Sequence, residues 1–313
     1  MVPAYNVAAF IGPALDSVLE QSLREIEVLV VDDGSTDGTL DVIRGIHDSR
    51  MKVLENSHRG VAAALNAGVA ASRGEFIAFL DGDDLWHREK LARQVAVIGD
   101  RDEFDLAFCW TRLIDERGED IGLAITEGAR SVSFAELLTD YSIANNSTVM
   151  VRRNVFPEGA WFQTEYVPCH DMDAWLRVAR LRPGNTVCVH DYLTYYRRRP
   201  GQFTSDVALI EQAWSRVLAH FGDIAPGETS PLAATARCNM FRFFAYLSYE
   251  QGRLGQAVQY GWRGFRSAPT SFLFDLRNWG MLAGLAAAWL LPAAWCQRLV
   301  KKLGRRRRAA TAG

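Results

Sequence analysis

The 313-residue sequence lacks several patterns that define specialised classes of protein. Its five cysteines show no Cys-x-x-Cys spacing, so neither a zinc site nor a disulfide framework is indicated, and scattered cysteines suit a reducing cytoplasm. The formal net charge is only −2, so the composition gives no reason to expect a nucleic-acid partner. We find no signal-peptide pattern. The length allows one large domain and a smaller C-terminal part.

The most informative segment is an acidic cluster that follows an apolar run. Residues 75–80 have the length and composition of a buried strand, and Asp81, Asp83 and Asp84 come directly after it. Ligands bind at the carboxyl ends of strands in open α/β sheets, and carboxylates packed closely together favour a hard divalent cation between them. The cluster fits a metal–diphosphate site. A polar turn followed by a helix N-cap has the same sequence signature.

A second acidic turn lies upstream, at residues 32–37, directly after the β-rich run 27–31. Between the two acidic turns come a short strand pattern at residues 51–54 and an Ala-rich helical pattern at residues 60–72. This alternation of strands and helices predicts a parallel sheet covered by helices. Two acidic strand ends in one such sheet favour a nucleotide site over two unrelated turns.

Five successive motifs resemble those of the family 2 glycosyltransferases, over about residues 1–205. The motifs are Val2–Asn6, Val31–Asp37, Gly60–Gly68, Arg73–Asp84 and His170–Arg177. The resemblance implies an inverting enzyme of the α/β class with the GT-A fold, a Rossmann-like, mostly parallel sheet with helices on both faces, here followed by a C-terminal helical segment. The family's first strand usually begins earlier, so we expect either a very short first strand or a true start upstream of Met1.

The resemblance also implies roles for individual positions. Those that it assigns to the nucleotide sugar in the first half of the chain are Pro3, Ala4, Tyr5, Asp33, Asp81 and Asp83. The first three would line the base and ribose pocket, Asp33 would accept a hydrogen bond from the base, and the last two would bound the ribose and diphosphate. Asp83 or Asp84 would hold a divalent cation, Mn²⁺ or Mg²⁺. Arg59 and Asn66 fit either a nucleotide contact or a packing role.

Asp171 is the candidate catalytic base. An acceptor hydroxyl must lose its proton as it attacks the anomeric carbon, and a carboxylate within hydrogen-bond reach accepts that proton. Asp171 precedes an amphipathic helical pattern that includes Trp175 and Leu176, and an N-cap role there is compatible with catalysis. Family members often carry Glu where this chain has His170, which changes the local electrostatics.

A basic stretch at residues 195–205 resembles the family segment that closes over the diphosphate. Arginine binds phosphate oxygens in a bidentate manner, so we expect Arg198 and Thr204 to contact the diphosphate. A solvated basic loop also fits part of this stretch. In the region that the resemblance assigns to the acceptor pocket, Trp161, Phe162 and Tyr166 fit either stacking on a sugar ring or packing in the core.

The C-terminal part has a different character. We expect a glycosyltransferase domain at residues 1–206, a helical region at residues 207–268, and an apolar, membrane-associated helix with a basic tail at residues 269–313. Within the helical region, residues 240–267 suggest two antiparallel helices joined by a turn at Gly252.

Residues 279–296 carry no charge, and seven Lys and Arg residues follow them. A membrane span needs about 20 apolar residues, so this stretch is marginal. Nucleotide sugars are cytoplasmic and the basic tail favours the same face, whereas a single crossing would separate the two. We therefore expect an interfacial or re-entrant helix, with Trp279, Trp289 and Trp295 at headgroup level and the basic cluster on anionic lipid. A buried hydrophobic helix is the alternative.

The leading interpretation is a metal-dependent glycosyltransferase peripheral to the inner face of a bacterial plasma membrane. It would move a sugar from a nucleotide-diphosphate sugar to a hydroxyl of a glycan or lipid-linked acceptor in cell-surface polysaccharide synthesis. A sugar nucleotidyltransferase is disfavoured because the opening of the chain lacks a Gly-rich triphosphate-binding loop with a basic residue. A non-catalytic membrane-tethered scaffold is disfavoured because all of the candidate aspartates are present.

Overall fold

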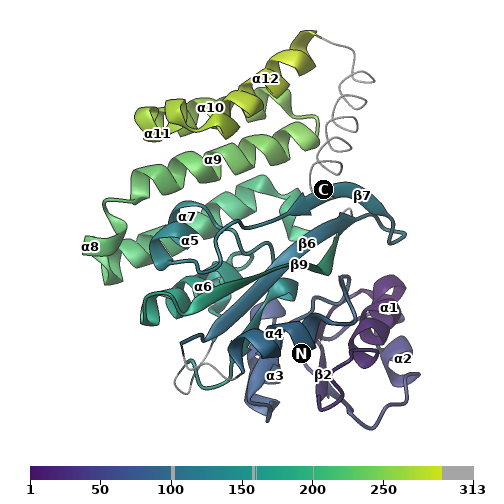
Figure 1. Ribbon diagram of the computed structural model, residues 1–313. Helices are drawn as coiled ribbons and strands as arrows, with labels where there is room; N and C mark the ends of the chain where they lie inside the picture. The colour runs from purple at the N-terminus through teal and green to yellow at the C-terminus, as the bar shows by residue number, and fades with distance from the viewer. Residues whose placement is uncertain (100–102, 157–158, 160, 200, 291–313) are drawn as a thin grey trace, which may run out of the picture. The chain divides into compact units, whose positions relative to one another are not determined.

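The computed structural model describes residues 1–99, 103–156, 159, 161–199 and 201–290. The chain divides into two compact units (Figure 1). The first unit comprises Met1–Leu137 and Tyr141–Arg198, and the second comprises Leu138–Asp140 and the chain from Arg199 onward. The division at residues 206 and 268 stays a prediction.

Three short parallel strands form one sheet of the first unit. In spatial order they are β1 (Val2–Ala4), β2 (Val28–Asp32) and β3 (Met51–Glu55). The helices that follow these strands in the chain are α1 (Ala8–Leu19), α2 (Thr39–Arg44) and α3 (Val61–Ala71). All five residues of β2 are buried, as expected for a parallel strand that is covered on both faces.

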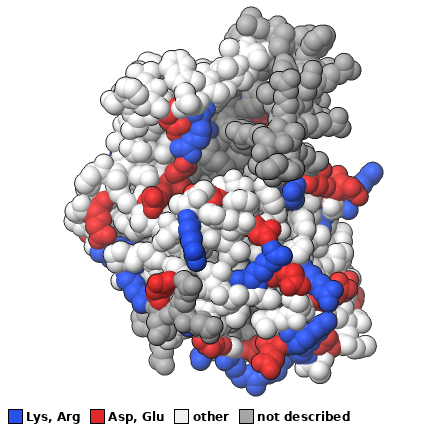
Figure 2. All heavy atoms as spheres, in the orientation of Figure 1, with Lys and Arg blue, Asp and Glu red and all other residues white. Residues whose placement is uncertain are grey.

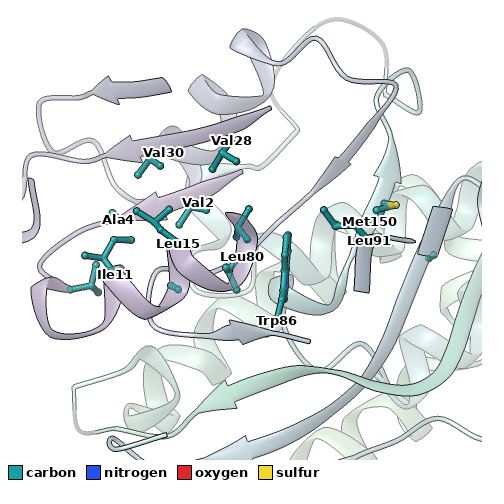
Figure 3. Packing of buried hydrophobic residues seen from close by; sticks show 14 of the residues in the cluster. Val2, Ala4, Ile11, Leu15, Val28, Val30, Leu80, Trp86, Leu91 and Met150 are labelled. Carbon is teal, nitrogen blue, oxygen red and sulfur yellow. The ribbon is translucent and has the colours of Figure 1, made fainter. Parts of the chain in front are cut away.

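A hydrophobic core lies between α1 and one face of this sheet. Ile11 and Leu15 of α1 are fully buried in the same cluster as Val2 of β1 and Val30 of β2 (Figure 3). The cluster continues through Trp86 toward the second sheet. Alternate residues of β2 point to the opposite face, where α3 contacts the strand. This core fixes the strand ends that carry the candidate site.

A second, mixed sheet completes the first unit. Its strands, in spatial order, are β4 (Phe76–Ala78), β8 (Met150–Arg152), β6 (Leu106–Ile114), β9 (Thr186–Arg197) and β5 (Leu85–Trp86), and β7 (Asp120–Ile125) pairs with β6. β6 and β9 are parallel, and the other pairs are antiparallel. The acidic turn follows β4, and β4 pairs with β8. Two hydrogen bonds join the end of β4 to Met1, the residue before β1: the Met1 amino group donates to the Ala78 carbonyl oxygen, and the Leu80 amide donates to the Met1 carbonyl oxygen.

Other short elements connect these strands. They are α4 (Lys90–Ile98), α5 (Phe134–Thr139), the 3₁₀ turns η1 (Asn146–Thr148) and η2 (Thr164–Tyr166), and α6 (His170–Leu181).

The second unit is helical. Its elements are η3 (Phe203–Ser205), α7 (Val207–Ile224), α8 (Pro226–Thr229), α9 (Ala233–Glu250), α10 (Leu254–Ser267), α11 (Pro269–Phe274) and α12 (Leu276–Leu290). The predicted helix pair is confirmed as α9 and α10, joined at Gly252, whose φ of +73° suits glycine. The unit has an aromatic core. The rings of Phe241 and Phe244 each contact the rings of Trp214 and Tyr260.

Within the part of the chain that the structure describes, no helix combines the length and apolarity that a membrane crossing requires. The predicted interfacial helix at residues 279–296 begins inside α12. Its last six residues and the basic tail lie outside the described residues.

Candidate active site

The acidic turn packs against the end of β1. The Asp84 amide donates to the Asp81 carbonyl oxygen at 3.0 Å, which closes the turn. A Cβ at Gly82 would lie 3.0 Å from the Pro3 carbonyl oxygen and 3.2 Å from the side chain of Val7. Glycine therefore allows the turn to approach the strand end that the sequence assigns to the nucleotide.

The second acidic turn reaches the same strand end. The Asp33 amide donates to the Ala4 carbonyl oxygen at 2.8 Å. The Asp33 carboxylate in turn accepts hydrogen bonds from the amides of Arg59, at 2.9 Å, and Gly60, at 2.7 Å. Asp33 is buried and fixes the loop that enters α3. Both acidic turns thus meet at Pro3 and Ala4, as the sequence indicates.

Tyr5 lies beside this junction and is 41% exposed. Its ring stacks on His58, with the ring centroids 4.2 Å apart. An exposed aromatic ring in this position offers a flat surface for a nucleotide base.

Asp84 is completely buried and has a full set of hydrogen-bond donors. Its carboxylate accepts from Asn145 Nδ2 at 2.6 Å, Ser147 Oγ at 2.7 Å and the Arg197 amide at 2.8 Å. Burial, reinforced by the charges of Asp83 and Asp81, raises the pKa of Asp84 well above its usual range. These contacts favour a structural role for Asp84 and leave Asp83 as the better candidate for a metal ligand.

Ser147 connects the two ends of the acidic turn. Its Oγ accepts a hydrogen bond from the Asp81 amide at 3.0 Å and donates to Asp84. The carbonyl oxygen of Ser147 accepts from Trp86 Nε1 at 2.8 Å and from Thr194 Oγ1 at 3.3 Å. The η1 turn is therefore the platform on which the acidic turn rests.

Arg197 fastens the acidic turn from the other side. Its Nε donates to the Asp83 carbonyl oxygen at 2.6 Å, and its Nη1 donates to the carbonyl oxygens of Asp115 and Glu116 at 2.9 and 3.0 Å. The side chain is almost fully buried. One guanidinium thus ties the turn to the loop between β6 and β7, a task that its planar fork of donors suits.

Asp171 lies close enough to the acidic turn to influence it electrostatically. It belongs to the first turn of α6, whose N-cap residue is Cys169, so the N-cap alternative for Asp171 does not hold. Burial, together with the charges of Asp83 and Asp171, raises the pKa of Asp81 to about 7. Burial also raises the pKa of Asp171 itself. As whole residues Asp81 and Asp171 are half-buried, whereas Asp84 is fully buried.

The remaining candidate residues have different environments in the structure. Asn66 exchanges two hydrogen bonds with the backbone of Phe162, at 2.8 and 2.9 Å, which favours its packing role. Phe162 and Trp161 are buried, so they belong to the core and do not offer a surface for a sugar. Arg198 follows β9, where its amide donates to the Ile114 carbonyl oxygen at 2.9 Å. Thr204 lies in η3 of the second unit.

Three residues that support the acidic turn were not predicted from the sequence: Asn145, Ser147 and Arg197. The polar run at residues 145–147 and the arginine at the end of a strand pattern are visible in the sequence. Their partners are not, because the contacts join segments that are far apart in the chain.

The acidic turn fits a divalent cation by its chemistry. Among the described residues, no group of three or more His, Cys, Asp or Glu side chains is arranged to hold a metal ion. One or two carboxylates are what Mg²⁺ normally takes from a protein when phosphates supply the other oxygen ligands. Burial, followed by the charges of Asp83 and Asp171, raises the pKa of Asp81, and a cation bound at the turn would stabilise its carboxylate.

Comparison with known proteins gives a consistent result. The sequence model described as "Glycosyl transferase family 2" matches residues 1–159. The "Uncharacterized glycosyltransferase alr2836" of Nostoc sp. is 37% identical over 133 residues, which are 42% of this chain and 41% of that protein, so the match spans less than half of its length. The Escherichia coli "UDP-Glc:alpha-D-GlcNAc-diphosphoundecaprenol beta-1,3-glucosyltransferase WfaP" is 28% identical over 213 residues, covering 66% of this chain and 79% of that one.

Two solved structures share the fold. The mannosyltransferase PcManGT from Pyrobaculum calidifontis, in complex with GDP-Man and Mn²⁺, has a TM-score of 0.61 and 21% identity over 97% of this chain and 84% of its own. S. aureus TarS 1-349, in complex with UDP-GlcNAc, has a TM-score of 0.55 and 19% identity over 86% of this chain and 88% of its own. The predicted GT-A fold, with parallel strands and C-terminal helices, is confirmed.

Proposed function

The chain belongs to glycosyl transferase family 2, and from this premise we propose that it is an inverting, metal-dependent enzyme. It transfers a sugar from a nucleoside-diphosphate sugar to a hydroxyl group of a glycan or lipid-linked acceptor. The observation that carries this proposal is the electrostatic proximity of Asp171, at the start of α6, to the acidic turn that follows β4.

Asp171 is the catalytic base in this proposal. It accepts the proton of the acceptor hydroxyl as the oxygen attacks the anomeric carbon from the face opposite the diphosphate, which inverts the configuration. Burial raises the pKa of Asp171 and so makes its carboxylate a better proton acceptor. Asp171 as a whole residue is half-buried, so it is not enclosed in the core.

Asp83 holds the divalent cation, Mn²⁺ or Mg²⁺, and Asp81 bounds the ribose and diphosphate. A bound cation supplies charge neutralisation to the departing nucleoside diphosphate. The structure of PcManGT is a complex with GDP-Man and Mn²⁺, which supports the same pairing of donor and metal here. Asp84 and Arg197 keep the turn in the conformation that presents Asp83.

The nucleotide lies across the ends of β1 and β2. Pro3, Ala4 and Tyr5 line its base and ribose, and Asp33 accepts a hydrogen bond from the base while it orders the loop before α3. In the basic stretch, Arg198 contacts the diphosphate, and the role expected of Thr204 from the sequence stays a prediction.

The acceptor and the location follow from the relatives and the tail. The name of WfaP specifies a diphosphoundecaprenol acceptor, which supports a lipid-linked acceptor and a function in cell-surface polysaccharide synthesis for this chain. The apolar C-terminal segment and its basic tail attach the enzyme peripherally to the inner face of the plasma membrane.

The proposal is tested by assaying hydrolysis and transfer of a panel of nucleotide sugars with Mn²⁺, Mg²⁺ or chelator. We expect Mn²⁺-dependent turnover with one of them. Asp171→Asn should reduce turnover by about 10²–10⁴-fold, the usual contribution of a general base. Asp83→Ala should abolish the metal dependence, and the exposed control Asp41→Asn should behave as wild type. Wild-type turnover by Asp171→Asn would refute the assignment of the base.

A further inference from the structure

The second unit exposes large apolar side chains where α11 meets α12. We call this set, which comprises Leu273, Phe274, Leu276, Trp279 and Leu282, the apolar ridge. Phe274 and Leu276 are 84% and 83% exposed, and the other three are between 38% and 50% exposed. The three α12 residues are spaced at intervals of three, so they lie on neighbouring positions of the helix. Single exposed apolar residues are ordinary, but a contiguous set of this size marks an interaction surface.

Buried neighbours and two hydrogen bonds fix the conformation of the ridge. Two neighbours of the ridge residues in the sequence are buried: Phe272, which directly precedes Leu273, and Asn278, which directly precedes Trp279. Asn278 Nδ2 donates to the Phe272 carbonyl oxygen at 3.0 Å, and Trp279 Nε1 donates to the Leu273 carbonyl oxygen at 2.9 Å. These contacts fix the corner between the two helices, so the apolar side chains project from a structured base.

Charges near the ridge are paired. Asp275 lies between Phe274 and Leu276, and its carboxylate accepts from Arg277 and from Arg242, each at 2.8 Å. Arg277 also contacts Asp140. The one carboxylate inside the ridge is therefore neutralised by two arginines, which lowers the cost of bringing this corner close to an anionic or apolar phase.

The sequence around the ridge is strongly basic. Residues 254–313 contain ten Lys and Arg residues and one acidic residue, Asp275, so they carry a formal charge of +9. Because the whole chain carries −2, residues 1–253 carry −11. In the view of Figure 2, charged side chains are numerous over the N-terminal elements and sparse over α10 and α11. Apolar ridge and basic sequence thus occur together at one end of an otherwise acidic chain.

We propose that the apolar ridge inserts into the interface of an anionic phospholipid membrane, a phase that the positive charge of the surrounding sequence favours. This inference rests on the membrane attachment included in the proposed function and assigns its apolar part to the corner between α11 and α12. Insertion of apolar side chains and attraction of Lys and Arg to anionic lipid are the two signals that together give stable peripheral binding. Pairing of two copies through this same ridge would bring two strongly basic segments together, so the excess of positive charge favours anionic lipid over such a dimer.

The test is sedimentation of the full chain with phosphatidylcholine vesicles that contain or lack phosphatidylglycerol. We expect binding that requires phosphatidylglycerol and weakens as salt is added. The double variant Phe274→Glu, Leu276→Glu should bind at least about tenfold more weakly, because each exposed side chain contributes about a tenfold change in partition. Both positions are exposed, so the variant should fold. The matched control is Leu181→Glu, Ile224→Glu, which alters two exposed apolar residues outside the ridge and should bind as wild type.

Two results would overturn the inference. One is wild-type vesicle binding by the double variant, which would place the apolar contact elsewhere. The other is a wild-type protein that ignores vesicles and dimerises in solution, with the double variant monomeric, which would assign the ridge to a second copy. Mn²⁺-dependent hydrolysis of the nucleotide sugar is measured on the same samples without lipid and should be equal in all of them. Loss of hydrolysis in every sample would count against the proposed function and leave the result on lipid binding standing.

Discussion

The first unit buries ionisable side chains, whereas the second exposes apolar ones. Asp84 and Arg197 are almost inaccessible to water, yet each is held by hydrogen bonds from or to several neighbours. Phe274 and Leu276 are apolar side chains that are mostly exposed to water. Burying a charge is unfavourable unless partners compensate for its lost hydration, and exposed apolar surface forgoes the stabilisation that burial would give. Folded proteins usually bury apolar side chains and expose ionisable ones. Each unit departs from this pattern at the place where we propose that a ligand binds.

The largest effect on stability is expected from Asp84→Ala. The substitution leaves the buried donors of Asn145, Ser147 and Arg197 without their acceptor, so we expect a loss of about 3 kcal/mol or more in the free energy of unfolding. Urea denaturation measures it. The exposed control Asp41→Ala should lose about 0.5 kcal/mol or less. Equal losses for the two variants would show that the buried carboxylate does not organise the site.

Arg197→Lys is expected to have an intermediate effect. Lysine keeps the charge but cannot reach three carbonyl oxygens with one planar fork, so we expect a loss of about 2 kcal/mol in unfolding free energy and a weaker affinity for Mn²⁺. The matched control is Arg112→Lys, which alters an arginine on β6 that pairs with Asp120 at 3.0 Å and should change stability by about 0.5 kcal/mol or less. A stable Arg197→Lys protein with normal Mn²⁺ affinity would contradict the fastening role.

The pH dependence of stability should be smaller but diagnostic. The pKa of Asp81 is about 7 in the folded protein, against an ordinary value of 3.8. Between these values the folded state holds a proton that the unfolded chain releases, so this residue makes stability fall as the pH rises from about 4 to about 7. We expect the melting temperature of the metal-free wild type to fall relative to that of Asp81→Asn across this window. A difference that is constant with pH would contradict the assignment.

The smallest effect on stability is expected in the apolar ridge. Phe274→Ala removes a side chain that is mostly in water, so the free energy of unfolding should change by about 0.5 kcal/mol or less. Phe272→Ala, two residues earlier in α11, removes a buried side chain and should lose about 3 kcal/mol or more. Thermal denaturation compares the two. Similar losses would mean that Phe274 is covered in solution and would end the contrast between the units.

Local patterns predicted much of the first unit. The acidic turns at 32–37 and 81–84 follow apolar runs, and a run of that kind has few structures open to it other than a buried strand. The turn at Gly252 was also predictable, because a glycine between two helical patterns marks a break.

The support of the site was not predictable, for a physical reason. Ser147 and Arg197 reach Asp84 across 63 and 113 residues of chain, and such pairings depend on how whole strands pack. The antiparallel pairing of β4 with β8 has the same origin, because the apolar pattern of a short strand does not encode the direction of its neighbour. The exposure of the ridge likewise depends on which face of α12 the neighbouring helices cover.

The central claim is that Asp83 and Asp171 perform different tasks in one site, the first binding metal and diphosphate and the second removing a proton. Isothermal titration of the nucleoside diphosphate, with and without Mn²⁺, tests it most directly when wild type, Asp83→Ala and Asp171→Asn are compared. We predict that Mn²⁺ strengthens binding to the wild type and to Asp171→Asn equally, and leaves binding to Asp83→Ala unchanged. Normal Mn²⁺ dependence in Asp83→Ala would contradict the account.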